Sequence, residues 1–174
     1  MKDDLREILS AALEAADPGI AIRRHLRAGG DKVLAGDAAF EPRRVSVLAA
    51  GKAACAMAEA AEQILGDRIS GGLVVTKEDH EQPLERLEVL VASHPEPDQR
   101  GVEAARRVSE LAESLEEGDL LLALISGGAS ALLADPAPPI ELADLKKLTG
   151  DLLRSGASID EINAVRKHVS MLKG

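Results

Sequence analysis

Aromatic side chains are almost absent from this chain of 174 residues, which has no Trp, no Tyr and a single Phe, Phe40. Proteins that bind nucleic-acid bases or sugars by stacking do so on aromatic rings. We therefore expect no such stacking surface. The core must be aliphatic, and a hydrophobic content of 45% is enough to build one.

Cysteine and long apolar runs are also scarce. Cys55 is the only cysteine, which excludes both an internal disulfide framework and a multi-cysteine metal site. No apolar run approaches the ~18–20 residues that cross a bilayer. Residues 1–5, MKDDL, lack the basic start and apolar stretch of a secretory signal. The sequence therefore predicts a cytoplasmic protein without a membrane partner.

Basic residues are outnumbered, because 21 Lys and Arg face 30 Asp and Glu and give a net charge of -9 at pH 7. A surplus of negative charge disfavours binding to nucleic acid, so we predict no nucleic-acid partner. An anionic ligand would need a local basic pocket. The length fits one domain, since domains usually have ~100–200 residues, and we expect a single domain over residues 1–174.

The first part of the chain has a helical pattern. Apolar residues recur at three- and four-residue steps over residues 3–16. Asp17 and Pro18 form a typical helix start, and Gly29 with Gly30 is a typical stop, which predicts a second helix over residues 18–27. The sequence thus predicts a helical segment of about residues 1–30. Residues 31–43 show no clear period and are predicted to be a polar connection before a body of about residues 44–174.

Short apolar runs alternate with helical patterns in that body. The predicted strands are 45–50, 72–76, 87–92 and 120–125, and the predicted helices are 53–65, 102–115, 141–154 and 159–172. Strands that are apolar throughout, separated by helices, are typical of a parallel sheet buried on both faces. The predicted fold class is α/β, with a Rossmann-like parallel sheet of about four or more strands and helices on both faces.

Polar residues follow each predicted strand, at the sheet edge where such folds bind ligands. They are Gly51-Lys52, Thr76-Lys77, the run Ser93-His94-Pro95-Glu96-Pro97-Asp98, and the run Ser126-Gly127-Gly128-Ala129-Ser130. Two lysines, a histidine and a glycine turn can form an anion pocket within an acidic protein.

The turn over residues 126–130 carries the clearest pattern for anion binding. Adjacent Gly127 and Gly128 let backbone N–H groups converge, a following helix start adds positive potential, and Ser126 and Ser130 offer hydroxyl donors. The alternative is a tight turn that needs small residues, Ala129 included, only for packing.

Lys52 can extend its ammonium across a cleft towards phosphate oxygens. It does not belong to a P-loop, because the first glycine of that motif is missing and Ala53 stands where Ser or Thr would bind magnesium. A solvated lysine is the alternative. His94 can orient a substrate oxygen or exchange a proton, or can be structural. Asp98 can bind magnesium or cap the next helix.

The last predicted helix has two faces. Ser158 and Glu161 have the spacing of a capping box, and the apolar stripe consists of Ile159, Ile162, Val165, Val169 and Leu172. Asn163, Arg166 and Lys167 lie on another face. That face is either simply solvated or binds a phosphate or carboxylate.

Four of these motifs together resemble a known family. They are VLAAGKAA with Met57, SHPEPD with Gly101, LISGGASAL, and INAVRKHVS leading to Lys173-Gly174. Their order and intervals over nearly the whole chain are similar to the N-terminal part of the type II glycerate kinases, the DUF4147/MOFRL family.

The resemblance implies a function. Members transfer a phosphoryl group from ATP to D-glycerate, usually giving 2-phosphoglycerate, with Mg²⁺ as cofactor. By the family pattern Lys52 is the catalytic cation. His94, the turn over residues 126–130, and Asn163, Arg166 and Lys167 would bind glycerate or ATP, and the metal ligands stay unassigned. Members also have a C-terminal MOFRL domain across the cleft, which we expect to be absent here, leaving an isolated chain that is inactive.

Two other functions stay open. Some relatives have been described as hydroxypyruvate reductases, although this chain lacks the G-x-G-x-x-G pattern of many dinucleotide-binding proteins. The other alternative is a non-catalytic module that binds a small anion or pairs with a second copy as a homo-oligomer.

Overall fold

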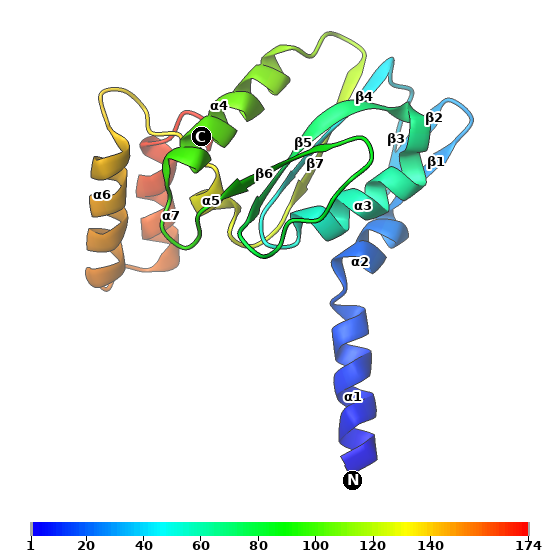
Figure 1. Cartoon of the computed structure of the whole chain (residues 1–174), viewed down its shortest axis with the longest axis horizontal. Helices are drawn as coiled ribbons and strands as arrows, with labels where there is room; N and C mark the ends of the chain where they lie inside the picture. The colour runs from blue at the N-terminus through cyan, green and yellow to red at the C-terminus, as the bar shows by residue number, and fades with distance from the viewer. Residues whose placement is uncertain (1, 174) are drawn as a thin grey trace.

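The structure, a computed structural model, describes residues 2–173 (Figure 1). Its elements, in chain order, are α1 (Lys2–Ala15), α2 (Pro18–His25), β1 (Leu26–Gly29), β2 (Lys32–Ala35), β3 (Ala38–Phe40), β4 (Arg44–Ala50), α3 (Ala54–Leu65), the 3-10 turn η1 (Gly66–Arg68), β5 (Ile69–Lys77), β6 (Glu88–Ala92), α4 (Gln99–Glu113), β7 (Asp119–Ile125), α5 (Ala129–Leu132), α6 (Leu142–Arg154) and α7 (Ile159–His168).

The main sheet has four parallel strands in the order β6-β5-β4-β7. Val47 in β4 lies opposite Gly72 of β5 and Leu122 of β7. In chain order, β5 and β6 are therefore added on one side of β4, and β7 is added on the other side. The predicted α/β class and Rossmann-like parallel sheet are confirmed.

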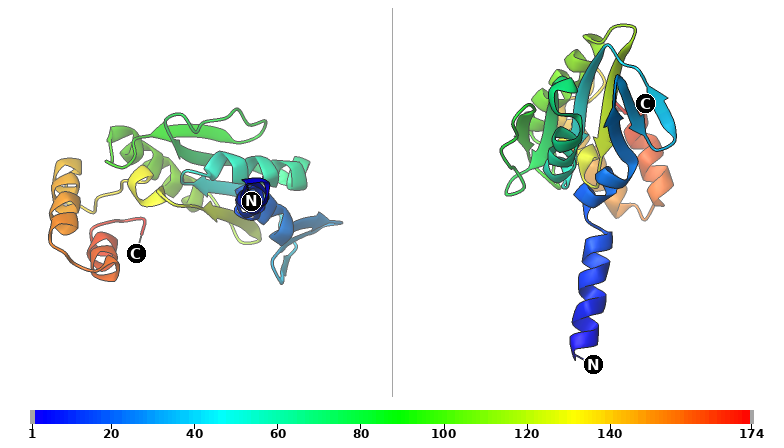
Figure 2. Two further views of the ribbon diagram at one scale, coloured as in Figure 1. Left: turned by 90° about the horizontal axis from the view of Figure 1, so that it is seen from below. Right: turned by 90° about the vertical axis from the view of Figure 1, so that its right-hand side faces the viewer.

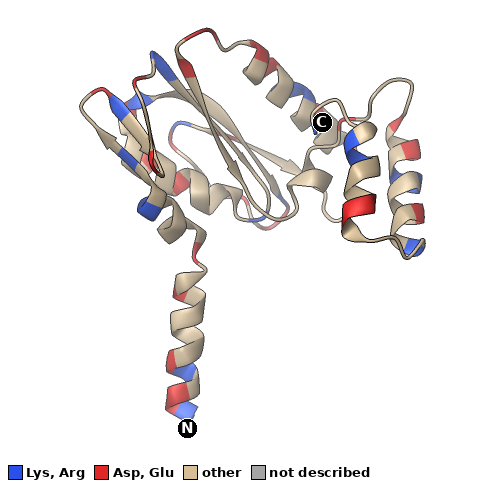
Figure 3. Cartoon of the chain, turned by 180° about the vertical axis from the view of Figure 1, so that it is seen from behind, with Lys and Arg blue, Asp and Glu red and all other residues tan. Residues whose placement is uncertain are grey.

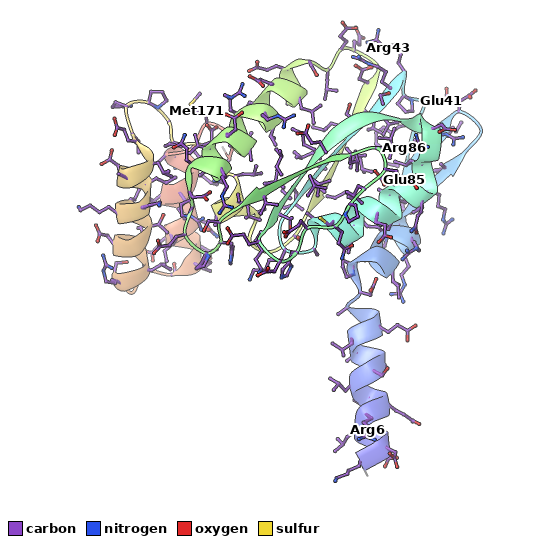
Figure 4. All side chains as sticks on the ribbon, in the orientation of Figure 1. Arg6, Glu41, Arg43, Glu85, Arg86 and Met171 are labelled. Atoms are coloured by element: carbon purple, nitrogen blue, oxygen red, sulfur yellow. The ribbon has the colours of Figure 1, made fainter. Side chains whose placement is uncertain are left out.

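Helices cover both faces of this sheet, because alternate residues of each strand point to opposite sides. Val45, Val47 and Ala49 of β4 belong to a core with the alanine-rich helix α3. Leu48 and Ala50 belong to a second core with α4 and α5. Cys55 is buried in α3 as a small core residue, as its setting among alanines predicts. The side chains fill the space between sheet and helices in Figure 4.

The predicted connection over residues 31–43 is wrong. β1, β2 and β3 form a separate antiparallel sheet, and the helix predicted to run to residue 27 ends at His25. Gly29 and Gly30 do not stop a helix but lie at the first hairpin turn. The strands have no readable period because their core-facing residues are few, with Leu26 and Val33 buried.

Helix α1 projects away from the rest of the molecule (Figures 1 and 2). It forms where the periodicity predicts it, but none of its described residues is buried, and Leu5, Ile8, Leu9 and Leu13 are each about 60% exposed or more. Among residues 2–173, no helix is both long and apolar enough to cross a membrane.

Helices α6 and α7 lie together beyond the carboxyl ends of the parallel strands, near α5, whereas β1–β3 lie towards the opposite end (Figures 1 and 2). The Ser158–Glu161 capping box is present. The predicted apolar stripe is wrong in part, because Ile162 is buried but Ile159 is 65% exposed and the helix ends at His168. Figure 3 shows acidic and basic residues interspersed over α6 and α7.

Candidate functional site

The candidate site lies at the carboxyl ends of β4 and β7, where the strand order reverses and where such sheets bind ligands. The two turns that leave these strands touch each other. Gly51 has φ +122°, and a Cβ there would lie 2.2 Å from Ser126 Oγ. Only glycine fits this contact, so the sequence brings Lys52 close to the glycine turn.

The backbone of Lys52 is held from two sides. Its N–H donates to the Gly127 carbonyl at 2.9 Å, and the His80 Nδ1 atom lies 2.8 Å from the Lys52 carbonyl oxygen. The buried Thr76 hydroxyl donates to the neighbouring Gly51 carbonyl at 3.2 Å. The Lys52 side chain itself is exposed. A fixed backbone thus carries an ammonium that is accessible to a ligand.

His94 faces the same turn. A Cβ on Gly128 would lie 3.1 Å from His94 Cδ2 and 3.3 Å from Lys52 Cγ, so the three residues are in close proximity. Burial lowers the pKa of His94, and the positive charges of Lys52 and Lys77 lower it further. Both effects favour the neutral form of the imidazole. Lys52, His94 and the glycine turn thus lie together, whereas the Lys77 ammonium donates to the Glu78 carbonyl at 3.1 Å and reaches this group only through the effect of its charge on His94.

The turn over residues 126–130 is built in a specific way. The Ser126 hydroxyl accepts a hydrogen bond from the Ala53 N–H at 3.1 Å and joins the two turns. In the part of the chain that the structure describes, the N–H groups of Gly127 and Gly128 donate no hydrogen bond. Helix α5 has only four residues, so its dipole adds little, and the exposed Ser130 supplies a hydroxyl.

The three predicted residues of α7 are placed differently from one another. Arg166 is half-buried and lines a small pocket with Ser130, next to the glycine turn. Asn163 and Lys167 are exposed and do not line that pocket. Arg166 is therefore the member of this group that the fold brings to the site.

Asp98 is the N-cap of α4. Its Oδ1 accepts hydrogen bonds from the N–H groups of Gly101, at 3.1 Å, and Ser93, at 3.3 Å, and Oδ2 pairs with Arg100 at 2.6 Å. Of the two roles left open by the sequence, the structure shows the capping one. The carboxylate is occupied by protein groups.

Two residues of this region were not predicted as site residues. His80 supports Lys52 through the contact given above, and Lys173 lines the pocket that Arg166 lines. His80 had a usable signal, because it follows β5 by three residues, at the same sheet edge as Lys52. Lys173 had only its place at the end of the fourth family motif, since it is the folded chain that brings it beside Ser130.

No group of three or more His, Cys, Asp or Glu side chains that could hold a metal occurs within residues 2–173. The side chains that lie against the glycine turn, those of Lys52 and His94, are instead cationic or neutral, and the Asp98 carboxylate at the same edge is occupied as a cap. The site as described suits anions.

A family model described as "Domain of unknown function (DUF4147)" matches residues 4–174. The chain belongs to the DUF4147 family. This confirms the resemblance stated from the sequence motifs.

Proteins from other organisms are close to this chain in sequence. A D-glycerate 2-kinase of Thermotoga maritima is 43% identical over 97% of this chain and 38% of its own length. A putative hydroxypyruvate reductase of Agrobacterium vitis is 42% identical over 98% of the chain and 36% of its own length. A solved protein of Pyrococcus horikoshii OT3 matches with a TM-score of 0.88 and 40% identity, over 97% of this chain and 38% of that one.

The chain therefore spans about two fifths of the length of these DUF4147 relatives. Within that span the fold is the same as in the solved relative. The elements that carry Lys52, His94 and the glycine turn all lie inside the matched residues.

Proposed function

We propose that this chain carries one wall of the active site of an ATP-dependent D-glycerate kinase that forms 2-phosphoglycerate. One observation supports this most: Lys52, His94 and the glycine turn meet where the strand order reverses. The names of the relatives support the substrate. Both the activity and the substrates of the whole protein are proposals.

The residues suit phosphoryl transfer. A hydroxyl oxygen of glycerate bonds to the γ-phosphorus, the bond to the bridging oxygen breaks, ADP leaves, and the hydroxyl proton is released. The transition state spreads negative charge over phosphoryl oxygens, so catalysis depends on alignment and on nearby cations and N–H donors. Lys52 supplies the cation, and Gly127 and Gly128 supply N–H groups. Neutral His94 orients a substrate oxygen.

Magnesium fits this part of the chain poorly. The donors at the site are cationic or neutral, Asp98 is occupied as a cap, and the described residues contain no three-ligand cluster. We therefore assign no magnesium ligand here and derive no step through the ion. The phosphate oxygens of a nucleotide are themselves good magnesium ligands. The cytoplasmic location predicted from the sequence remains part of this proposal.

Calorimetric titration of this chain with Mg-ATP and with D-glycerate tests the proposal. Lys52→Ala removes the exposed cation of the site. Lys32→Ala is the matched control, because Lys32 is an exposed lysine of β2, in the separate sheet, whose ion-pair partner within residues 2–173 is Glu41 at 3.0 Å. We expect saturable Mg-ATP binding that Lys52→Ala weakens about tenfold or more and Lys32→Ala leaves intact.

Equal weakening by the two variants, or no binding to a folded wild-type chain, would contradict the proposed site. Oxidation of NADH with hydroxypyruvate, measured on the same sample, tests the reductase alternative suggested by the name of one relative. If the sample oxidises NADH with hydroxypyruvate and does not bind Mg-ATP, the reductase function replaces the kinase proposal.

A further inference from the structure

A small pocket lies beside the glycine turn, between α5, α6, α7 and the segment after α7. Its volume is about 20 Å³, and Ser130, Arg166, Ser170 and Lys173 supply its polar lining. These residues lie between 3 and 43 positions apart in sequence, and the fold brings Ser130 to the other three. Two of the four carry positive charge, which is the first indication of an anion site.

Lys173 lines this pocket and is held in place by hydrogen bonds. Its Nζ donates to the Leu133 carbonyl at 2.6 Å, and backbone hydrogen bonds of Met171 with Asp135 (3.0 Å) and Ala137 with Val169 (2.9 Å) fix the segment around it. Burial lowers the pKa of Lys173 to about 8, and the positive charge of Arg166 acts in the same direction. The Asp135 carboxylate opposes both effects.

The charges here are not balanced by the protein. The Arg166 guanidinium makes no hydrogen bond or ion pair within residues 2–173, although it lies close enough to Lys173 to lower its pKa. One carboxylate, that of Asp135, opposes these two cations and offsets only part of their charge, and its buried Oδ2 accepts no hydrogen bond and does not itself favour an anion. An anion between Arg166 and Lys173 would offset their repulsion, and the exposed Ser130 hydroxyl adds a donor.

The size of the pocket restricts the anion. One water needs roughly 10–15 Å³ of such volume, so a pocket of about 20 Å³ admits one or two oxygen-sized atoms. A carboxylate can place an oxygen there, whereas a triphosphate chain cannot enter. The Lys52 side of the turn has no such restriction, because the Lys52 side chain is exposed.

We propose that the pocket lined by Ser130, Arg166 and Lys173 binds the carboxylate of the hydroxy-acid substrate, while the phosphate donor binds on the Lys52 side of the glycine turn. This assignment rests on the proposed kinase function and divides its site into two parts. Arg166 binds the carboxylate directly. Lys173 both contributes charge and holds α5 in place through the Leu133 carbonyl.

NMR titration of the chain with D-glycerate, with glycerol and with Mg-ATP tests this division. Glycerol has the hydroxyls but no carboxylate and should not bind. We expect Arg166→Met and Lys173→Met each to weaken D-glycerate binding about tenfold or more, and to change Mg-ATP binding less than about twofold. Lys146→Met is the control, because Lys146 is an exposed lysine of α6 that does not line the pocket.

Unchanged D-glycerate affinity in both variants, or an equal loss of Mg-ATP affinity, overturns the division and leaves the kinase proposal standing. If Lys173→Met does not fold, the wild-type titration decides: D-glycerate must shift the amide signals of Ser130 and Ser170. If neither D-glycerate nor Mg-ATP binds, the kinase proposal fails, and acetate tests the pocket alone. Acetate shifts at Ser130 that disappear in Arg166→Met support the carboxylate site, and their absence overturns it.

Discussion

Glu62 provides a strong test of what holds the site together. This residue of α3 is only 9% exposed, and its carboxylate accepts three backbone hydrogen bonds from the loop that leads into β6. Oε1 accepts from the N–H groups of Arg86 (2.8 Å) and Leu87 (3.0 Å), and Oε2 accepts from that of Glu85 (3.1 Å). That loop follows β5 and includes His80, so Glu62 fixes one side of the Lys52 turn.

The expected destabilisation is graded. A hydrogen bond to a charged group contributes about 1.5–3 kcal/mol. Glu62→Ala leaves the buried N–H of Leu87 and the part-buried N–H groups of Glu85 and Arg86 without this partner, and we expect it to lower the free energy of unfolding by about 3–5 kcal/mol. Glu62→Gln keeps one acceptor oxygen but presents an NH₂ group to the Glu85 N–H, so we expect a loss of about 1.5–3 kcal/mol.

Urea unfolding followed by circular dichroism measures both losses. Glu59→Ala is the control, because Glu59 lies one turn earlier on α3, is exposed, and has a single long contact of 3.5 Å to Gln63. The reasoning is refuted if Glu62→Ala costs less than about 1 kcal/mol, or if Glu62→Gln and Glu62→Ala are equally stable.

Three further outcomes are expected. Gly51→Ala should lower the free energy of unfolding by about 3 kcal/mol, because φ is +122° and the new Cβ meets Ser126 Oγ at 2.2 Å; urea unfolding measures it. Hydrogen bonds from neighbouring arginines hold the pKa of Asp119 well below its usual range. The stabilisation that these hydrogen bonds provide is therefore present above about pH 4 and is lost as pH falls. We expect the melting temperature of Asp119→Asn to depend less on pH than that of the wild type between about pH 5 and 2.5. The pKa of His94 should lie below about 6.5 by NMR, and Lys52→Ala should raise it.

Each of these outcomes has a result that would contradict it. Gly29→Ala, where a Cβ meets nothing within 4 Å, should be nearly neutral, and a similar loss there would show that the Gly51 effect is not local. If the melting temperature of Asp119→Asn depends on pH as that of the wild type does, the Asp119 carboxylate does not contribute to the loss of stability in acid. An unchanged His94 pKa in Lys52→Ala would mean that the two side chains do not face each other in solution.

The parallel sheet was predictable because its signals are local and redundant. Each strand from β4 to β7 contains a short, mainly aliphatic run, and the caps that start two of the helices, Asp17 and Asp98, are visible in the sequence. The ends of such strands meet at one edge, so the placement of Lys52 and His94 followed from the fold class.

The small antiparallel sheet was missed although the sequence contains a signal for it. Gly30-Asp31 and Gly36-Asp37 are both two-residue loops between strands, and Gly-Asp is a common pair in such hairpins. The strands themselves are too short and too exposed to show alternation. The residues of the two turns, and not the spacing of apolar residues, were the usable signal for this sheet.

The last helix shows the opposite failure, in which a real period was over-interpreted. Ile159, Ile162 and Val165 recur with helical spacing, but only Ile162 meets the rest of the fold closely enough to be buried. Periodicity reports which residues share a face, and it does not report what covers that face. The same holds for α1, whose apolar residues are regular and exposed.

The division of the site into a Lys52 side and an Arg166 side follows from how differently the fold supports the two cations. Lys52 stands on a backbone fixed by Gly127 and His80, with its side chain accessible, as suits a group that meets a large, mobile phosphate chain. Arg166 is half-buried beside a second cation in a pocket of about 20 Å³, as suits a small group held in one place. Phosphoryl transfer requires both, because the acceptor must be oriented while charge develops on the donor. The glycine turn lies between the two cations, so a variant on the Arg166 side should leave binding of the phosphate donor on the Lys52 side nearly unchanged.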